Sequence, residues 1–173
     1  MSGGDPLILS EKRLIRIIKA LNDIPHVKII RLHTRIPVVN PEYVTDSVIE
    51  AFKIRKPIYM CIHINHHFEL TNSVETLCKK LVRSGISLLS QTVLLKGIND
   101  SAEILETLMR RLIENRIKPY YLHHGDLAIG TSHFRTTISD GQNIVRELRL
   151  RTSGLCQPTY VLDIPGGFGK IPT

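Results

Sequence analysis

Helical and extended segments alternate four times along the first two thirds of the sequence, and this alternation limits the folds that the chain can adopt. For example, "SEKRLIRIIKALN" (10–22) has apolar residues at helical spacing, and the apolar run "VKIIRLHTR" (27–35) follows it. Strands that alternate with helices through short connections form parallel sheets, because each helix returns the chain to the start of the next strand. The predicted helices are 10–22, 41–54, 72–85 and 100–116, and the predicted strands are 27–35, 57–64, 86–95 and 117–124.

The regular alternation of helix and strand ends after the fourth predicted strand. A helix is predicted at 139–152 and a last strand at 159–164, which leads into "PGGFGK" (165–170). The sequence therefore predicts one α/β domain over residues 1–173. Its βα units run to about residue 135, and residues 136–173 hold the C-terminal helix, strand and lysine loop.

Composition and charge narrow the class of protein. The net charge is +7, but the 23 basic residues are scattered, aromatic residues make up 5% and there is no Trp, so a nucleic-acid surface is not expected. No apolar run is long enough to cross a membrane. The sequence has three cysteines, Cys61, Cys78 and Cys156, which lack metal-type spacing, and no signal peptide is recognised. An odd number of cysteines in such a sequence favours a reducing, cytoplasmic compartment.

Polar side chains gather where the predicted strands end. Because the carboxyl ends of parallel strands meet at one edge, we expect a functional site there. Any one of these residues, taken alone, is typical of a solvent-exposed loop, but four consecutive strands share the pattern. The residues are His33, Arg35, His63, His66, Gln91, His123, His124 and Asp126.

Two glycine-containing segments are candidate ligand loops. In "SGGDPL" (2–7), Gly3 and Gly4 allow backbone groups to approach a ligand, and Asp5 can accept hydrogen bonds from a cationic group such as an α-amine. In "PGGFGK", the Lys170 amine could form a Schiff base with the aldehyde of pyridoxal phosphate. The alternatives are a turn that leads into a helix and a flexible tail with an incidental lysine.

Asp126 and Asp163 both follow predicted strands beside glycine-containing loops. If the two carboxylates converge, a cation such as a long-chain ammonium group would stabilise them together. The alternative is that each caps a helix or a turn, which is the commonest use of Asp.

In order and spacing, a set of segments resembles the lysine 2,3-aminomutases, radical S-adenosylmethionine enzymes that also use pyridoxal phosphate. The resemblance covers essentially the whole chain and implies a partial (βα) barrel of the radical S-adenosylmethionine type. The segments that carry it are "SGGDPL" (2–7), "RLHTRIPVV" (31–39), "HINHHFE" (63–69), "QTVLLKGIND" (91–100), "PYYLHHGD" (119–126), "GTSHFRT" (130–136), "TSG" (152–154) and "PGGFGK" (165–170).

The resemblance implies a role for each candidate residue. Lys170 matches the lysine that holds pyridoxal phosphate. Asp126 and Asp163 match the pair that binds the side-chain ammonium of substrate lysine, which the family converts to β-lysine. Gly3, Gly4 and Asp5 match the segment that binds the amino group of S-adenosylmethionine, and His63 and Gln91 match strand-end residues near the cofactors.

The iron–sulfur cluster is where the chain departs from the family. Family members hold a four-iron, four-sulfur cluster through C-x3-C-x2-C, upstream of the segment that "SGGDPL" resembles, and this chain has no such triplet. We therefore expect no metal ligands in this chain, which resembles the middle and C-terminal portion of an aminomutase. A second chain could supply the cluster, and the family implies a homo-oligomer.

Three functions remain open on the sequence alone. The first is a truncated or split lysine 2,3-aminomutase that depends on a cluster-binding segment. The second is the paralogue that prepares β-lysine for elongation factor P, although that branch does not keep the pair Asp126 and Asp163. The third is a non-catalytic fragment that binds pyridoxal phosphate or nothing.

Overall fold

The computed structural model describes residues 1, 3–164, 166 and 169–173. The parts of the two glycine-containing segments that fall on Ser2, Pro165, Gly167 and Phe168 lie outside the described residues. Six strands form one sheet in sequence order, and β1 pairs with β2, and β4 with β5, in parallel. The strands are β1 (Ile30–Thr34), β2 (Ile58–His63), β3 (Ser87–Val93), β4 (Ile117–His123), β5 (Thr159–Asp163) and β6 (Lys170–Pro172).

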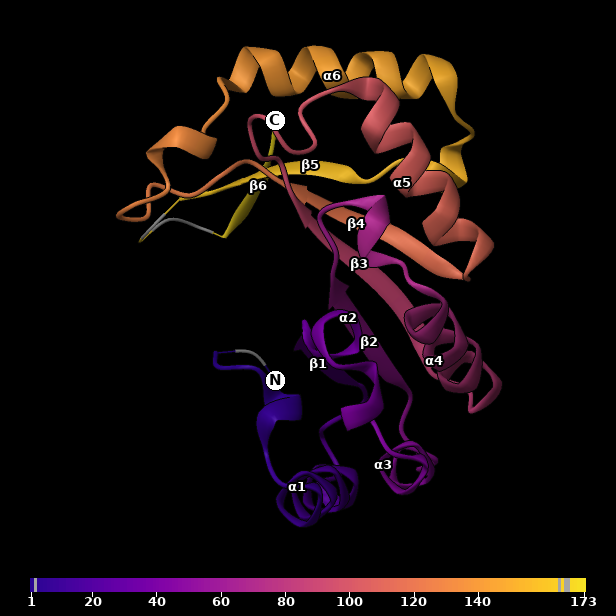
Figure 1. Cartoon of the computed structure of the whole chain (residues 1–173). Helices are drawn as coiled ribbons and strands as arrows, with labels where there is room; N and C mark the ends of the chain where they lie inside the picture. Colours follow the sequence, from indigo (N-terminus) through magenta and orange to yellow (C-terminus); the bar gives the residue numbers. More distant parts are fainter. Residues whose placement is uncertain (2, 165, 167–168) are drawn as a thin grey trace. The chain divides into compact units, whose positions relative to one another are not determined.

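Helices separate the strands from β1 to β5, as the alternation predicts (Figure 1). The predicted helix 41–54 is instead a 3-10 turn followed by α3, because the Thr45 side chain accepts a hydrogen bond from Val48 N and begins a new helix. The short α2 was not predicted. The α-helices are α1 (Glu11–Asp23), α2 (Ile36–Val39), α3 (Asp46–Ala51), α4 (Asn72–Arg83), α5 (Ala102–Glu114) and α6 (Ile138–Arg151); the 3-10 helices are Pro6–Ile8, Pro41–Tyr43, His67–Glu69, Ser132–Phe134 and Gly154–Cys156.

The chain packs as two compact units, each with its own apolar core. The first unit comprises residues 1–63, 69–89 and 115–117 and holds β1, β2, α1, α3 and α4. Leu32, Met60 and Ile62 of its strands are completely buried, as are Ile18 of α1 and Leu81 of α4. The buried residues recur at the period of each element, so the apolar pattern of the sequence accounts for this core.

The second unit comprises residues 64–68, 90–114 and 118–173. Its helices α5 and α6 pack side by side, next to β4 and β5 (Figure 1). Leu108 and Met109 of α5, Leu148 of α6, Leu122 of β4 and Tyr160 of β5 are buried in its core. This unit contains Gln91, Asp126, Asp163 and Lys170 of the predicted site residues.

The last strand is the main difference from the predicted order of elements. Lys170 was predicted to end a loop, but it is the first residue of β6, which runs antiparallel to β5. Gly166 (φ +72°) and Gly169 (φ +95°) adopt backbone conformations that favour glycine, and they allow the chain to reverse. The reversal pairs Ile171 with Leu162 and places Lys170 opposite Asp163.

Candidate functional site

An amine and a carboxylate meet where β5 and β6 begin to pair. Asp163 is the last residue of β5 and Lys170 is the first of β6, and the two are register partners. Lys170 Nζ donates directly to Asp163 Oδ2. The two side chains are 32% and 38% exposed for Lys170 and Asp163 respectively, so the pair lies at the surface and small molecules can reach it.

Strand β4 adds an imidazole and an aromatic ring to this pair. His123 Nδ1 lies 3.6 Å from Asp163 Oδ2, and Lys170 Nζ lies 5.9 Å from the centroid of the Tyr121 ring. An ammonium group at this place therefore meets a carboxylate and an aromatic face at once. We call Tyr121, His123, Asp163 and Lys170 the amine site.

Asp126 is exposed in the loop after β4. It lines a cavity of about 170 Å³ together with Phe134 and Arg135 of the predicted "GTSHFRT" segment. Among the described residues no ion pair involves Asp126, and its proposed pairing with Asp163 stays a prediction.

A partly buried hydrogen bond between His124 and Tyr160 was not predicted from the sequence. His124 Nδ1 and Tyr160 Oη lie 2.7 Å apart. Burial raises the pKa of the Tyr160 hydroxyl to about 12, with the Asp140 charge as a smaller cause. Burial also lowers the pKa of His124, although the Asp126 charge opposes this shift. Burial therefore favours the neutral form of both groups. Only the histidine had a signal in the sequence.

In the first unit, the Asp5 carboxylate binds the backbone. Its Oδ1 accepts from Leu7 N at 2.9 Å and its Oδ2 accepts from Arg35 N at 2.6 Å. These bonds fix the "SGGDPL" segment to the end of β1, where the Arg35 side chain pairs with Glu69 at 2.5 Å. Gly3 and Gly4 are exposed and have positive φ, so their backbone groups remain accessible. Asp5 therefore has a structural role beside the predicted ligand role.

His63 and Gln91 occupy their predicted strands. His63 is the last residue of β2, in the first unit. Gln91 lies in β3 within the second unit, and its carbonyl oxygen accepts from Ile64 N at 3.0 Å. Their proposed contacts with cofactors stay predictions.

Asn99 is a completely buried amide that sequence reasoning did not single out. Its Nδ2 donates to the carbonyl oxygens of Asn65 (2.7 Å) and Val93 (2.9 Å), and its Oδ1 accepts from Leu95 N at 2.7 Å. These bonds join the loops that follow β2 and β3. The signal available in the sequence was the position of this polar residue within the "QTVLLKGIND" segment, which carries part of the family resemblance.

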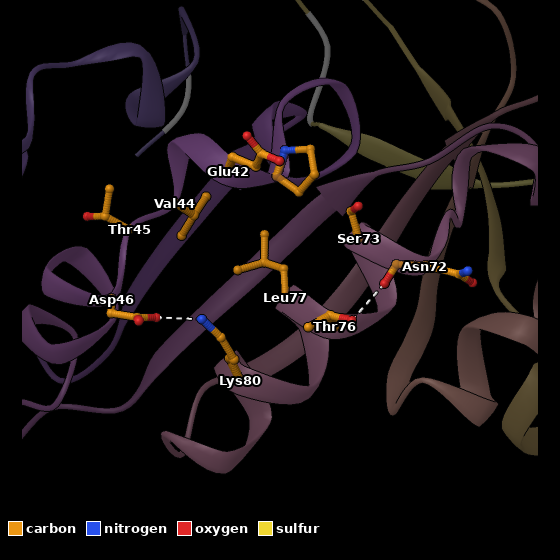
Figure 2. Close-up of a pocket in the computed structure, with 10 residues that line it drawn as sticks. Glu42, Val44, Thr45, Asp46, Asn72, Ser73, Thr76, Leu77 and Lys80 are labelled. Carbon is orange, nitrogen blue, oxygen red and sulfur yellow. Dashed lines mark hydrogen bonds and ion pairs between the residues drawn. The ribbon is translucent and has the colours of Figure 1, made fainter.

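A groove of about 490 Å³ lies in the first unit, away from the predicted residues (Figure 2). Val44 and Leu77 provide apolar side chains, and Asp46 pairs with Lys80 at 2.7 Å. This exposed pair has the same chemistry as Asp163 with Lys170, but no imidazole or aromatic ring is among the described residues that line the groove. We therefore treat it as a comparison site.

The described residues fit one of the predicted cofactors better than another. Pyridoxal phosphate needs an accessible primary amine, and Lys170 offers one beside a glycine-containing turn. An iron–sulfur cluster needs grouped thiolates, whereas Cys61, Cys78 and Cys156 are each buried. No cluster of three or more metal-binding side chains occurs within the described part of the chain. These cysteines do not fit a cluster.

No protein-family model matches the chain, but curated proteins do. The L-lysine 2,3-aminomutase of Acetoanaerobium sticklandii is 42% identical over 172 residues, which are 99% of this chain and 42% of that protein. That of Fusobacterium nucleatum is 45% identical over 99% of this chain and 40% of its own length. The glutamate 2,3-aminomutase of Clostridioides difficile is 40% identical over 99% of this chain and 41% of its own length.

Solved structures agree on the fold. SuiB of Streptococcus suis, in a crystal structure bound to S-adenosylmethionine, matches with a TM-score of 0.62 at 16% identity, over 94% of this chain and 38% of SuiB. The predicted α/β fold, in which parallel strands alternate with helices, is thus confirmed, and SuiB shares it. No helix among the described residues is long and apolar enough to cross a membrane. The chain is 40–45% identical to these curated aminomutases over nearly all of its residues, which confirms the predicted resemblance to the lysine 2,3-aminomutases, and it spans about two fifths of the length of those relatives.

Proposed function

We propose that this chain supplies the amino-acid and pyridoxal phosphate site of an L-lysine 2,3-aminomutase, an isomerase that moves the 2-amino group of L-lysine to carbon 3. The contact between Asp163 and Lys170 is the observation that carries the proposal. It brings together an amine that can hold the cofactor and a carboxylate that can hold an ammonium. Because the chain spans about two fifths of its curated relatives, the complete reaction is proposed for a protein that also provides the cluster-binding segment.

Each residue of the amine site would have a different role. Lys170 would hold pyridoxal phosphate, which supplies delocalisation of an unpaired electron when it is bound. Asp163 would accept hydrogen bonds from the side-chain ammonium of lysine, with Asp126 as the second carboxylate. The Tyr121 ring would stabilise the same positive charge, and His123 would orient the Asp163 carboxylate.

In the first unit, S-adenosylmethionine would bind against the exposed backbone of Gly3 and Gly4. Asp5 would hold that backbone in place through its bonds to Leu7 N and Arg35 N. His63 and Gln91 are proposed to lie near the cofactors, as the family resemblance implies. The proposal also places the protein in the cytoplasm, as a homo-oligomer that a second chain with the cluster-binding segment could complete. These predictions come from the sequence and from the family resemblance.

Glutamate is the second candidate substrate, because one curated relative is a glutamate 2,3-aminomutase. The carboxylate of Asp163 favours lysine, since it would repel the side-chain carboxylate of glutamate and attract an ammonium. The β-lysine enzyme that serves elongation factor P and a non-catalytic fragment that binds only pyridoxal phosphate are the remaining alternatives.

Peptide mapping tests the cofactor site. The protein is treated with pyridoxal phosphate and then borohydride, digested, and analysed by mass spectrometry. We expect the adduct at Lys170 and its loss in Lys170→Ala, while Lys80→Ala serves as the matched control and leaves the labelling of Lys170 unchanged. Label spread evenly over surface lysines such as Lys79 and Lys80 would contradict the proposed site.

A further inference from the structure

The Lys170 amine forms an ion pair with Asp163, the carboxylate that would bind the substrate ammonium in the proposed function. The register of β5 and β6 places Lys170 directly opposite Asp163, and Lys170 Nζ contacts Asp163 Oδ2. Gly166 and Gly169 permit the turn that joins these two residues. The contact thus follows from the backbone of the hairpin as well as from the side chains.

The surroundings of Asp163 suit one cation at a time. His123 Nδ1 lies 3.6 Å from the same oxygen, Oδ2, that contacts Lys170 Nζ, and the Tyr121 ring lies 5.9 Å from Lys170 Nζ. A second ammonium at Oδ2 would have to lie beside the first, and like charges at such a separation repel. An incoming ammonium that binds at Oδ2 therefore competes with Lys170.

We infer that Asp163 is a single ammonium subsite that Lys170 and the side chain of a diamino acid occupy in turn. In the free protein, Lys170 fills the subsite, and its ion pair with Asp163 slows the reaction of its amine with aldehydes without preventing it. When a ligand ammonium takes over Asp163, the Lys170 amine is released and becomes available for reaction. This inference rests on the proposed function. It names Asp163 as the residue that couples the binding of a ligand ammonium to the reaction of Lys170 with pyridoxal phosphate.

Labelling kinetics test the inference without any catalytic assay. In the labelling reaction the neutral amine adds to the aldehyde of pyridoxal phosphate and water leaves. Borohydride then delivers hydride to the same carbon and solvent supplies a proton to the nitrogen. Stopping the reaction at intervals and quantifying peptides gives initial rates for Lys170 and Lys80. We compare the wild type with Asp163→Asn and with Asp46→Asn, which changes the matched pair in the groove of Figure 2.

We expect Asp163→Asn to increase the rate at Lys170 at least threefold and to leave Lys80 unchanged. Asp46→Asn should leave the rate at Lys170 unchanged. The amide introduced by Asp163→Asn has nearly the shape of the carboxylate that it replaces, and a thermal unfolding curve confirms that the variant folds. An unchanged or slower rate at Lys170 in this variant would overturn the inference.

A second arm tests whether a ligand cation shares the subsite. N,N-dimethylbutylammonium keeps one N–H donor but, as a tertiary amine, cannot condense with an aldehyde. It should speed the labelling of Lys170 in the wild type and have no such effect in Asp163→Asn; no acceleration in the wild type would overturn the sharing. If Lys170 shows no preference over Lys79 and Lys80 even in Asp163→Asn or with the tertiary amine present, the proposed cofactor site fails, which is a separate result.

Discussion

Gly141 lies so close to Tyr160 that a β-carbon at position 141 would come within 2.0 Å of the Tyr160 hydroxyl oxygen and 2.4 Å of Cζ. Position 141 is in α6 and Tyr160 is in β5, so this close approach sets the distance between the helix and the strand. The tyrosine hydroxyl is held there by His124. This contact supports β5, which carries Asp163 at its end.

Gly141→Ala should therefore destabilise the protein, although alanine is the better helix former by about 1 kcal/mol. Overpacking of a rigid aromatic ring costs about 1–3 kcal/mol, so we expect a net loss of up to about 2 kcal/mol in the free energy of unfolding. Urea denaturation measures it, with the exposed neighbour Gln142→Ala as control. A variant more stable than the wild type would show that Tyr160 can move away at little cost.

His124 should make stability depend on pH in mildly acidic solution. Burial lowers its pKa from 6.5, so the unfolded chain binds a proton at a higher pH than the folded one does. The contribution of His124 is present above pH 6.5 and is lost as the pH falls toward the lower, folded-state pKa. Denaturation midpoints of the wild type should thus decline more steeply below pH 6.5 than those of His124→Gln. Parallel curves for the two proteins would contradict this.

Asn99 is expected to be essential for the loops that follow β2 and β3. Asn99→Ala removes two donors and one acceptor from a completely buried position and leaves backbone groups of Asn65, Val93 and Leu95 without those partners. We expect a loss of about 2–4 kcal/mol in the free energy of unfolding. Asn143→Ala, at an exposed position of α6, should cost no more than about 0.5 kcal/mol. Equal losses in the two variants would rule out a special role for Asn99.

The structural role of Asp5 can be measured by amide hydrogen exchange. Asp5→Ala should speed the exchange of Leu7 N–H and Arg35 N–H, because both lose their acceptor. Asp46→Ala, which removes an exposed carboxylate elsewhere in the same unit, should leave both rates unchanged. Unaltered exchange in Asp5→Ala would mean that these bonds do not fix the segment.

Long apolar patterns made the main elements predictable. Helices α1, α4, α5 and α6 and strands β1 to β5 all lie within about three residues of their predicted ranges. Strand β6 was not predicted, because "KIP" has no periodicity of its own and becomes a strand only by pairing with β5. The same reason applies to the four-residue α2.

The candidate site was predictable in its residue types but less so in its contacts. Asp163 and Lys170 were singled out separately, one for a substrate ammonium and one for a cofactor. Their contact depends on the register between β5 and β6, which the sequence does not specify. The bond between His124 and Tyr160 likewise depends on tertiary packing, because the two residues are 36 positions apart.

A chimera tests most directly whether this chain can carry the amino-acid site of a lysine 2,3-aminomutase. This chain replaces the matching 172-residue segment of the Clostridium subterminale L-lysine 2,3-aminomutase, to which it is 42% identical. The purified chimera receives its cofactors without oxygen and then 13C-labelled L-lysine or L-glutamate, and NMR identifies the product. We predict β-lysine from L-lysine, no product from L-glutamate, and none from the chimera with Lys170→Ala. A folded chimera that retains its iron and forms no β-lysine would contradict the account.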